Sequence, residues 1–558
     1  MKKYTTILAI AILSLFVSCV KDLDTLPLNE TDFTSEKAYE NAESYLQGLA
    51  YINAYWAFVS QNDAGSSDIE VENAGQSELC RQYMILNELT TDELKTWWGD
   101  GYSNPLQYHS WSDAPNNAMV AVYTRCMKGI ALVNEFLLQT TDAKLEARGH
   151  SSHKAEVAGY RAEARFHRAM FYYLMMDFFG NPPFALEENI GGAVPKQIKR
   201  ADLYEWIEGQ LLDLVADGSD MPSYGAVPYP RPTKGSAMAL LARMYLNAEV
   251  YTGTPQWQKA KDAADAVCKM GYRIHDNYQE LFLEDNTTNG AAEEMIFAIE
   301  YDRDHAQSWG GTTHLCSGAF GDNLSKGLPK ALGLTGVTAM HPDTWDGYHI
   351  PDDLVARFEL QGVTWGGGDG TFGYDRASSD KRAFFYNGNQ TQDFGTNENT
   401  SGGWLCWKWV NMDSEGNIRN SETVNFKFSS ADFPVFRLAE MYLIYAEADA
   451  RLNGGTVTDP VAIARIKELR DRAGVATPAS MDLDWLLDER VRELLWEGHR
   501  RVDLIRYGYF TSASFPWTYK GGVKEGNVEL DSYRTIFPII PSDLIANPNL
   551  TQNEGYKQ

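Results

Sequence analysis

The greatest concentration of side chains that could do chemistry lies in the segment WWGDGYSN, residues 97–104. It combines flat aromatic rings with a carboxylate, a hydroxyl and an amide. A neutral sugar presents an apolar CH face and a rim of hydroxyl groups, so its binding site needs aromatic rings and hydrogen-bonding groups. A second segment of this kind is QSWGGTT, residues 307–313. The candidate sugar-binding residues are Trp97, Trp98, Tyr102, Asn104 and Trp309, with Arg81 and Asp68 as upstream polar partners.

The adjacent tryptophans Trp97 and Trp98 are expected to split, with one ring packed inward and one facing outward. We expect Trp98 to be the exposed ring. Five other tryptophans are weaker candidates: Trp345, Trp365, Trp404, Trp407 and Trp409. A strand whose side chains alternate inward and outward would also explain the last three.

A charged stretch over residues 488–508 also carries groups that could react. Paired carboxylates such as Glu489 and Glu493 could act as acid and base in glycoside hydrolysis. His499 beside Asp503 could form half of a catalytic dyad. However, interleaved arginines would keep these carboxylates ionised, and a general acid must hold a proton. The apolar residues of the stretch fall at helical spacing, so we predict a salt-bridged scaffold helix with no catalytic role.

Other motifs of catalysis and cofactor binding are missing from the sequence. It has no HExxH, GxSxG or GxxxxGK[ST] motif. Residues 368–373 match GxGxxG formally, but they lie in a glycine-rich loop that no helix follows. The carboxylates at 302–304 and 352–353 lack the spacing of a calcium loop. The five cysteines after Cys19 show no CxxC pair. We therefore expect no catalytic residue, no bound metal and no cofactor.

The N-terminus predicts export. Residues 1–18 read as a signal peptide, with Lys2 and Lys3 before an apolar run that ends at Val17 and is too short to span a bilayer comfortably. A small residue directly precedes Cys19, as at a lipoprotein processing site. We expect Cys19 to carry the lipid that anchors the chain to a membrane.

The net charge of −27 argues against one class of partner. An acidic protein repels nucleic acid phosphates, so DNA or RNA binding is not expected. The charge suits a soluble extracellular surface and gives no sign of an acidic ligand. An apolar fraction of 44% is that of a folded globular protein.

Helices form the predicted frame, after a polar tether over residues 19–34. Residues 296–425 lose the helical stripes and gain Gly, Asn, Asp and aromatics, and this stretch is too long to be a mere linker. The fold class is therefore mainly α, with a helical region over 35–295, a second region over 296–558 and a loop-rich part at 296–425. Loops placed by such a frame generally carry the binding residues. The predicted helices cover residues 35–49, 120–138, 155–179, 202–215, 234–251, 257–270, 434–452, 461–473 and 483–507.

Five segments that together span the chain resemble the SusD/RagB family, outer-membrane lipoproteins of Bacteroidetes that capture nutrients, mostly glycans. They are EARFHRAMFYY from Glu163 with FGNPP from Phe179; KGSA from Lys234 through Leu246; FRLAEMYLIYAE from Phe436; the charged stretch 488–508; and IFPIIP from Ile536 with NPNL from Asn547 and Gln552-Asn553. Each alone is moderately specific, and all five in order make a strong resemblance. Residues 90–111 and 307–313 are most similar to the starch-binding members.

The resemblance implies a SusD-like fold, with tetratricopeptide-like helical hairpins as scaffold and a loop-rich, partly β insertion. It implies a non-catalytic, lipid-anchored protein that faces the cell exterior and captures an oligosaccharide, best matched by an α-glucan of the starch type. It also implies a partner, a TonB-dependent transporter of the SusC type that receives the sugar. Two alternatives remain open: a peptide-capturing lipoprotein of the RagB branch and a glycoside hydrolase.

Overall fold

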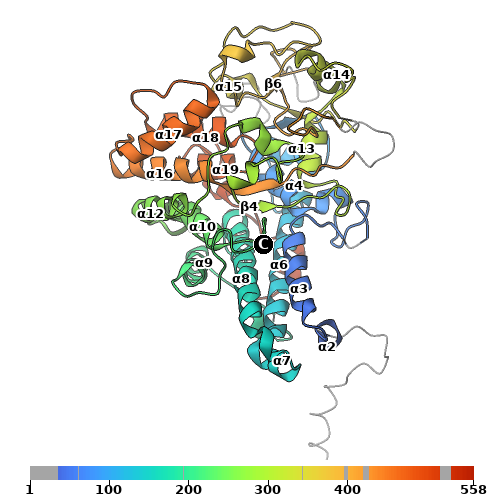
Figure 1. Ribbon diagram of the computed structural model, residues 1–558, viewed down its shortest axis with the longest axis vertical. Helices are drawn as coiled ribbons and strands as arrows, with labels where there is room; N and C mark the ends of the chain where they lie inside the picture. Colours follow the sequence, from blue (N-terminus) through green and yellow to red (C-terminus); the bar gives the residue numbers. More distant parts are fainter. Residues whose placement is uncertain are drawn as a thin grey trace, which may run out of the picture.

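The computed structural model describes residues 35–60, 62–192, 194–341, 343–394, 400–418, 427–515 and 529–557. The predicted signal peptide, the lipidation site Cys19 and the tether lie outside these residues. Figure 1 shows a frame of helices with the loop-rich part of the chain gathered at its upper end. Among the described residues, no helix has the length and apolar character needed to cross a membrane.

The lower part of the frame is a pair of long helices, α6 (Asn117–Gln139) and α8 (Lys154–Phe179), which pack along their length (Figure 1). Helix α6 begins where the side chain of Asn116 accepts hydrogen bonds from the first free backbone N–H groups. The two helices approach closely at Gly129, where an added Cβ would lie only 2.6 Å from the ring of Phe171. A small residue at this position is therefore what lets α8 bury its aromatic face against α6.

Helical hairpins make up the rest of the frame. Helix α10 (Lys234–Leu246) packs on α12 (Trp257–Cys268), and α12 packs on α16 (Leu438–Leu452) from the far end of the sequence. Helix α16 also contacts α17 (Pro460–Ala473) and α18 (Leu483–Leu494). The seam between α10 and α12 is rich in buried alanines, and these small side chains allow the helices to stack closely. The buried alanines are Ala237, Ala239, Ala242, Ala260, Ala263 and Ala264.

The predicted mainly helical fold class is confirmed, and the strands are few and short. The strand pairs among the described residues are antiparallel, and the longest joins the start of the loop-rich part to a segment just after its end. The pairs are β1 (Lys95–Thr96) with β5 (Tyr348–His349), β2 (Pro183–Phe184) with β3 (Lys196–Gln197), β4 (Met295–Ile299) with β8 (Phe433–Arg437), and β6 (Phe385–Tyr386) with β7 (Leu405–Cys406). The other helices are α2 (Ser35–Ala38), α3 (Glu43–Ala54), α4 (Leu79–Met84), α5 (Ser103–Gln107), α7 (Asp142–Ala147), α9 (Arg200–Val215), α11 (Ala248–Thr252), α13 (Gly311–Ala319), α14 (Asp322–Ala331), α15 (Asp352–Val355), α19 (Arg500–Arg506) and α20 (Pro541–Ala546).

Several sequence predictions about helices are wrong. The predicted helix over 35–49 is interrupted between α2 and α3, and residues 434–437 of the predicted helix over 434–452 belong to the strand β8. The loop-rich part contains the helices α13 and α14, whose many glycines and polar residues hide the helical period. The predicted helix over 483–507 is two helices, α18 and α19, separated by a turn with positive φ at Trp496 and Gly498. This turn is held from outside, because Glu93 accepts a hydrogen bond from the backbone N–H of Trp496 and Glu88 accepts one from that of Gly498.

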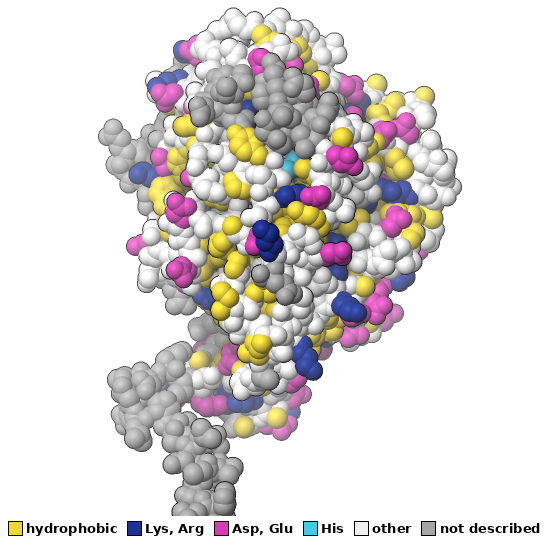
Figure 2. All heavy atoms as spheres, turned by 180° about the vertical axis from the view of Figure 1, so that it is seen from behind, with side chains coloured by type: hydrophobic (Ala, Val, Ile, Leu, Met, Phe, Trp, Pro, Cys, Tyr) yellow, Lys and Arg dark blue, Asp and Glu magenta, His cyan; other side chains and the backbone are white. Residues whose placement is uncertain are grey.

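The charged stretch is a buried ion-pair network, as the scaffold interpretation predicts. Arg437 lies at its centre, with its guanidinium 2.9 Å from Glu294, 2.6 Å from Glu493 and 2.7 Å from Glu497. Arg382 joins Glu489 to Glu493 at 2.7 and 3.1 Å. On the face of the molecule shown in Figure 2, by contrast, acidic and basic side chains are scattered among apolar ones.

Candidate functional site

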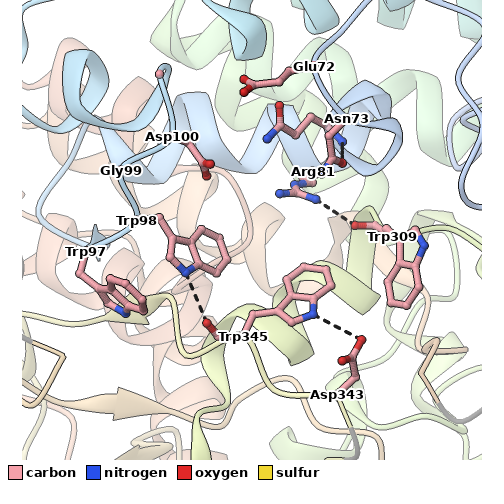
Figure 3. A pocket seen from close by; sticks show the side chains of 12 residues that line it. Glu72, Asn73, Arg81, Trp97, Trp98, Gly99, Asp100, Trp309, Asp343 and Trp345 are labelled. Carbon is pink, nitrogen blue, oxygen red and sulfur yellow. Dashed lines mark hydrogen bonds between the residues drawn. The ribbon is translucent and has the colours of Figure 1, made fainter.

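An open pocket of about 670 Å³ lies between α4, the loop after β1 and the start of α13, where segments far apart in the sequence meet (Figure 3). Four tryptophans form its aromatic part, and polar groups surround them. Its lining consists of Glu72, Asn73, Gln76, Arg81, Trp97, Trp98, Gly99, Asp100, Gly101, Trp309, Asp343 and Trp345.

The pairing of β1 with β5 places the first two tryptophans. Because Thr96 is opposite Tyr348, the chain leaves the pair with Trp97 and Trp98 beside the backbone of residues 345–347. The indole N–H of Trp97 donates to the carbonyl of Asp346, and that of Trp98 donates to the carbonyl of Trp345 at 3.3 Å. Both rings are therefore anchored by their polar edges.

The residues beneath Trp98 leave its ring no room to move. An added Cβ at Gly347 would lie 2.1 Å from the ring, so only glycine permits the contact. On the inner side the ring packs against Tyr348, with centroids 5.0 Å apart, and against His314 at 6.5 Å. Asp346, which lies before the glycine, has φ of +49°, in the left-handed region that non-glycine residues seldom adopt. The turn 345–347 is thus a fixed support for both indoles.

The opposite wall of the pocket is built by α4 and the start of α13. Buried Glu78 connects the two, since it accepts hydrogen bonds from the backbone N–H of Arg81 at 2.5 Å and of Gly311 at 2.9 Å. The guanidinium of Arg81 donates to the carbonyl of Trp309 at 3.1 Å and lies 5.7 Å from the ring centre of Trp345. Arg81 is therefore a positioned cation, and it makes no ion pair with any carboxylate in the described part of the chain.

The polar rim carries hydrogen-bonding groups of both kinds. Burial raises the pKa of Asp100, and the charge of Arg81 opposes that rise. Glu72, Asn73 and Asp343 add acceptors and one amide around the opening, as Figure 3 shows. Amide, carboxylate and guanidinium groups around aromatic faces are what a ring of sugar hydroxyls requires.

Four of the seven predicted site residues line this pocket: Trp97, Trp98, Trp309 and Arg81. The prediction that Trp98 is the exposed ring of its pair is wrong. Trp97 is the exposed one, at 37%, whereas Trp98 is half-buried by its contacts below.

The other three predicted residues lie elsewhere. Tyr102 is 1% exposed and belongs to the hydrophobic core, so it cannot stack on a ligand. The amide oxygen of Asn104 accepts a hydrogen bond from Gln107 within α5. Asp68 forms ion pairs with Arg125 at 2.7 Å and with Lys128, so its charge is already balanced by these two cations. None of the three lines the pocket.

One pocket residue was underrated by the sequence interpretation. Trp345 forms the floor between the other tryptophans, although its sequence surroundings gave it no preference over four similar residues. Three of those four, Trp404, Trp407 and Trp409, are fully buried and pack in the core, so the alternation of inward and outward side chains that could have explained them does not occur. Trp365 packs edge-on against Trp404. The turn sequence Asp346-Gly347 directly after Trp345 is the signal that could have singled it out.

A catalytic role for the charged stretch does not fit the geometry. Glu489 and Glu493 are completely buried. Burial would raise the pKa of Glu493, but Arg472, Arg437 and Arg382 outweigh it and lower the pKa to about 2. A carboxylate with that pKa cannot act as a general acid at neutral pH.

A second pair of buried carboxyls, Glu88 and Glu93, precedes the tryptophan loop in sequence and holds the turn between α18 and α19. Burial, with the neighbouring Glu93, raises the pKa of Glu88 well above its usual value, and burial raises that of Glu93 to about 7. The folded protein therefore keeps protons that the unfolded chain releases above pH 4.5. This pair contributes stability that is fully present below about pH 4.5 and is lost as the pH rises through about 7.

We expect Glu88→Gln to reduce this pH dependence, because the amide stays neutral and can still accept from Gly498 and donate to Glu93. The gap in unfolding temperature between pH 5 and pH 8 should be smaller in this variant than in the native protein, as measured by thermal denaturation. The exposed Glu205→Gln is the control and should leave the gap unchanged. An unchanged gap in Glu88→Gln would show that this pair does not hold the protons.

Comparison with known proteins places the chain in a family. The SusD family model matches residues 293–556, and a model described as starch-binding, associating with outer membrane, matches residues 66–246. The Starch-binding protein SusD of Bacteroides thetaiotaomicron is 32% identical, over 98% of this chain and 98% of its own length. The chain belongs to the SusD family. SusD family proteins are non-catalytic binding proteins, which confirms the prediction that this chain is not an enzyme. The family description also indicates association with the outer membrane.

Solved structures of other SusD-like proteins share the fold. A SusD homologue from Bacteroides thetaiotaomicron covers 94% of this chain and 98% of its own, with a TM-score of 0.66 and 19% identity. The surface glycan-binding protein A of the same organism, solved with laminarihexaose, covers 92% of this chain and 99% of its own, with a TM-score of 0.63 and 18% identity. These likenesses support the fold alone.

Proposed function

We propose that this SusD family protein captures oligosaccharides of the starch type at the tryptophan pocket. The observation that carries the proposal is the arrangement of the indoles. The rings of Trp98 and Trp345 are inclined by 51° with centroids 6.3 Å apart, and those of Trp309 and Trp345 by 45° at 6.0 Å. Rings inclined in this way do not form one flat platform. A non-planar set of rings suits a curved α-glucan better than a flat β-1,4-linked chain, and the name of the 32% identical relative agrees with this choice.

We further propose that the chain works at the cell surface, anchored through a lipid on Cys19, and passes its ligand to a TonB-dependent transporter of the SusC type. The predicted signal peptide and the outer-membrane association of the family support the location. The proposal of this transporter as the partner rests on family membership. Deletion of the transporter gene should leave surface glycan binding intact and abolish uptake, which separates capture from transport.

Calorimetric titration of the soluble chain, beginning after Cys19, against a panel of glycans tests the proposed ligand. We expect maltoheptaose to bind, and laminarihexaose and a fructan of similar length to bind more weakly or not at all. Binding of peptides without any glycan would overturn the proposal in favour of the peptide-capturing alternative. Preference for laminarihexaose would contradict the α-glucan assignment while leaving the pocket a sugar site.

We expect Trp97→Ala to weaken maltoheptaose binding by about 5- to 30-fold, roughly 1–2 kcal/mol for the loss of one stacking face. The fold should persist, because this ring is exposed. Trp97→Phe should retain most of the affinity, since it keeps a flat ring. Trp365→Ala, which removes an indole outside the pocket, serves as the control and should bind like the native chain. Equal binding by Trp97→Ala would remove Trp97 from the site.

A further inference from the structure

A second pocket, of about 400 Å³, lies where the segment around Tyr278 meets residues 376–384 and the end of α17. It shares no lining residue with the tryptophan pocket. Three of its lining residues are cations, namely Arg376, Lys381 and Arg472. In a chain of net charge −27, such a gathering of positive charge is unexpected.

Arg376 is held in the pocket wall by aromatic rings. Its guanidinium lies 4.7 Å from the ring centre of Phe372 and 4.8 Å from that of Trp407. These contacts orient the guanidinium without neutralising it. No carboxylate of the described residues forms an ion pair with it, and burial lowers the pKa of Arg376.

Lys381 adds a second uncompensated charge. Its backbone N–H donates to the carbonyl of Ala473 at 2.9 Å, which ties it to the end of α17. Its side chain runs along Gly474, where an added Cβ would lie 3.1 Å from the lysine Cε. Within the part of the chain that the structure describes, its ammonium group has no carboxylate partner within 4.0 Å. The ammonium can therefore swing over the opening of the pocket.

Arg472 differs, because it is buried and its charge is balanced. Its guanidinium lies 2.7 Å from Glu294 and also pairs with Glu493. Its Nε, however, has no hydrogen-bond partner among the described residues. The one acid that lines the pocket is the exposed Asp276. Among the lining residues, two cations without an ion-pair partner in the described part of the chain therefore face one acid.

We propose that this pocket binds an oxyanion, the carboxylate or sulfate group of an acidic sugar. The planar fork of Arg376 matches a carboxylate or sulfate edge, and Lys381 supplies a mobile second charge. The rings of Tyr278 and Phe384, which are parallel within 9° and almost completely buried, bound the pocket from the inside. They give a bound anion an apolar boundary but no exposed face on which a sugar ring could stack. The choice of a sugar as the carrier of the anionic group rests on the proposed role in glycan capture.

Calorimetry of the soluble chain at low ionic strength tests this site with sodium glucuronate, sodium sulfate and glucose. We expect glucuronate to bind and glucose not to bind at this pocket. Weaker binding of sulfate would identify the sugar-borne anion as the ligand, and equal binding would identify the oxyanion alone. Added sodium chloride should weaken the interaction. No binding of either anion would overturn the proposal.

Variants locate the site. Lys381→Gln should weaken glucuronate binding by about 10-fold, as expected for one charge-assisted hydrogen bond, and Arg376→Gln should weaken it further. Since the Arg376 change also removes packing, Lys381, whose side chain is exposed, provides the independent test. Lys196→Gln removes the same charge from an exposed strand elsewhere and should have no effect. Native affinity in Lys381→Gln and Arg376→Gln together would contradict the proposal. Maltoheptaose binding should be unchanged in all three variants.

Discussion

Replacing Arg437 by methionine should lower the free energy of unfolding by about 3–5 kcal/mol, the cost of leaving buried carboxylates without their cation. Arg437 is 1% exposed and contacts the carboxylates of Glu294, Glu493 and Glu497. Methionine keeps much of the volume of arginine but none of its five N–H donors. The carboxylates would then be buried with too little positive charge and would take up protons or admit water. Urea unfolding followed by tryptophan fluorescence measures the change.

A matched control comes from an ion pair on the surface. Lys467 pairs with Asp471, and both side chains are 60% exposed. Lys467→Met removes one cation of an ion pair, as Arg437→Met does, but should cost less than about 1 kcal/mol because water solvates the remaining carboxylate. Similar small effects in both variants would mean that the network around Arg437 is not needed for stability.

Gly347→Ala is expected to abolish most glycan binding, by about 30- to 900-fold, while the protein remains folded. The added methyl group would lie 2.1 Å from the indole of Trp98, so the ring must leave its place. That ring is fixed between Tyr348 and the carbonyl of Trp345, and its displacement disturbs the neighbouring indoles as well. Losing two stacking faces of roughly 1–2 kcal/mol each gives the expected size. The local overpacking itself should cost about 1–3 kcal/mol of stability.

A control variant and an unfolding measurement test this prediction. Gly209→Ala adds the same methyl group in α9 where no atom lies within 4 Å, so binding and fold should both be unchanged. Thermal unfolding of Gly347→Ala separates a displaced ring from a collapsed protein. Native affinity in Gly347→Ala would show that the position of Trp98 does not matter for the ligand.

The sequence was sufficient to find the aromatic loop but not to assemble the pocket. Composition singled out Trp97, Trp98 and Trp309, because flat rings beside polar groups are visible in a linear sequence. Trp345 joins them only through the pairing of β1 with β5, a contact that no local pattern encodes. Asp68 lies close to the aromatic loop in sequence, but it pairs with Arg125 and so lies outside the site.

The same limit applies to the helices. Long amphipathic helices such as α6 and α8 follow from the period of their apolar residues. The break between α18 and α19 does not, because its cause is the pair Glu88 and Glu93, about 400 residues earlier in the chain. Local periodicity therefore predicted the elements, and tertiary hydrogen bonds determined where one of them stops.

The hydrogen bond from Trp97 to Asp346 joins residues 249 positions apart, and the other walls of the pocket are similarly remote from one another. Contacts of such long range form slowly, because much of the chain must be ordered before they can close. The capture site is thus complete only when both halves of the chain have folded together. A sugar that contacts several of these walls would link them non-covalently, and its binding free energy would add to the stability of the whole fold. Resistance to proteolysis should therefore rise with ligand across the entire chain rather than in one loop.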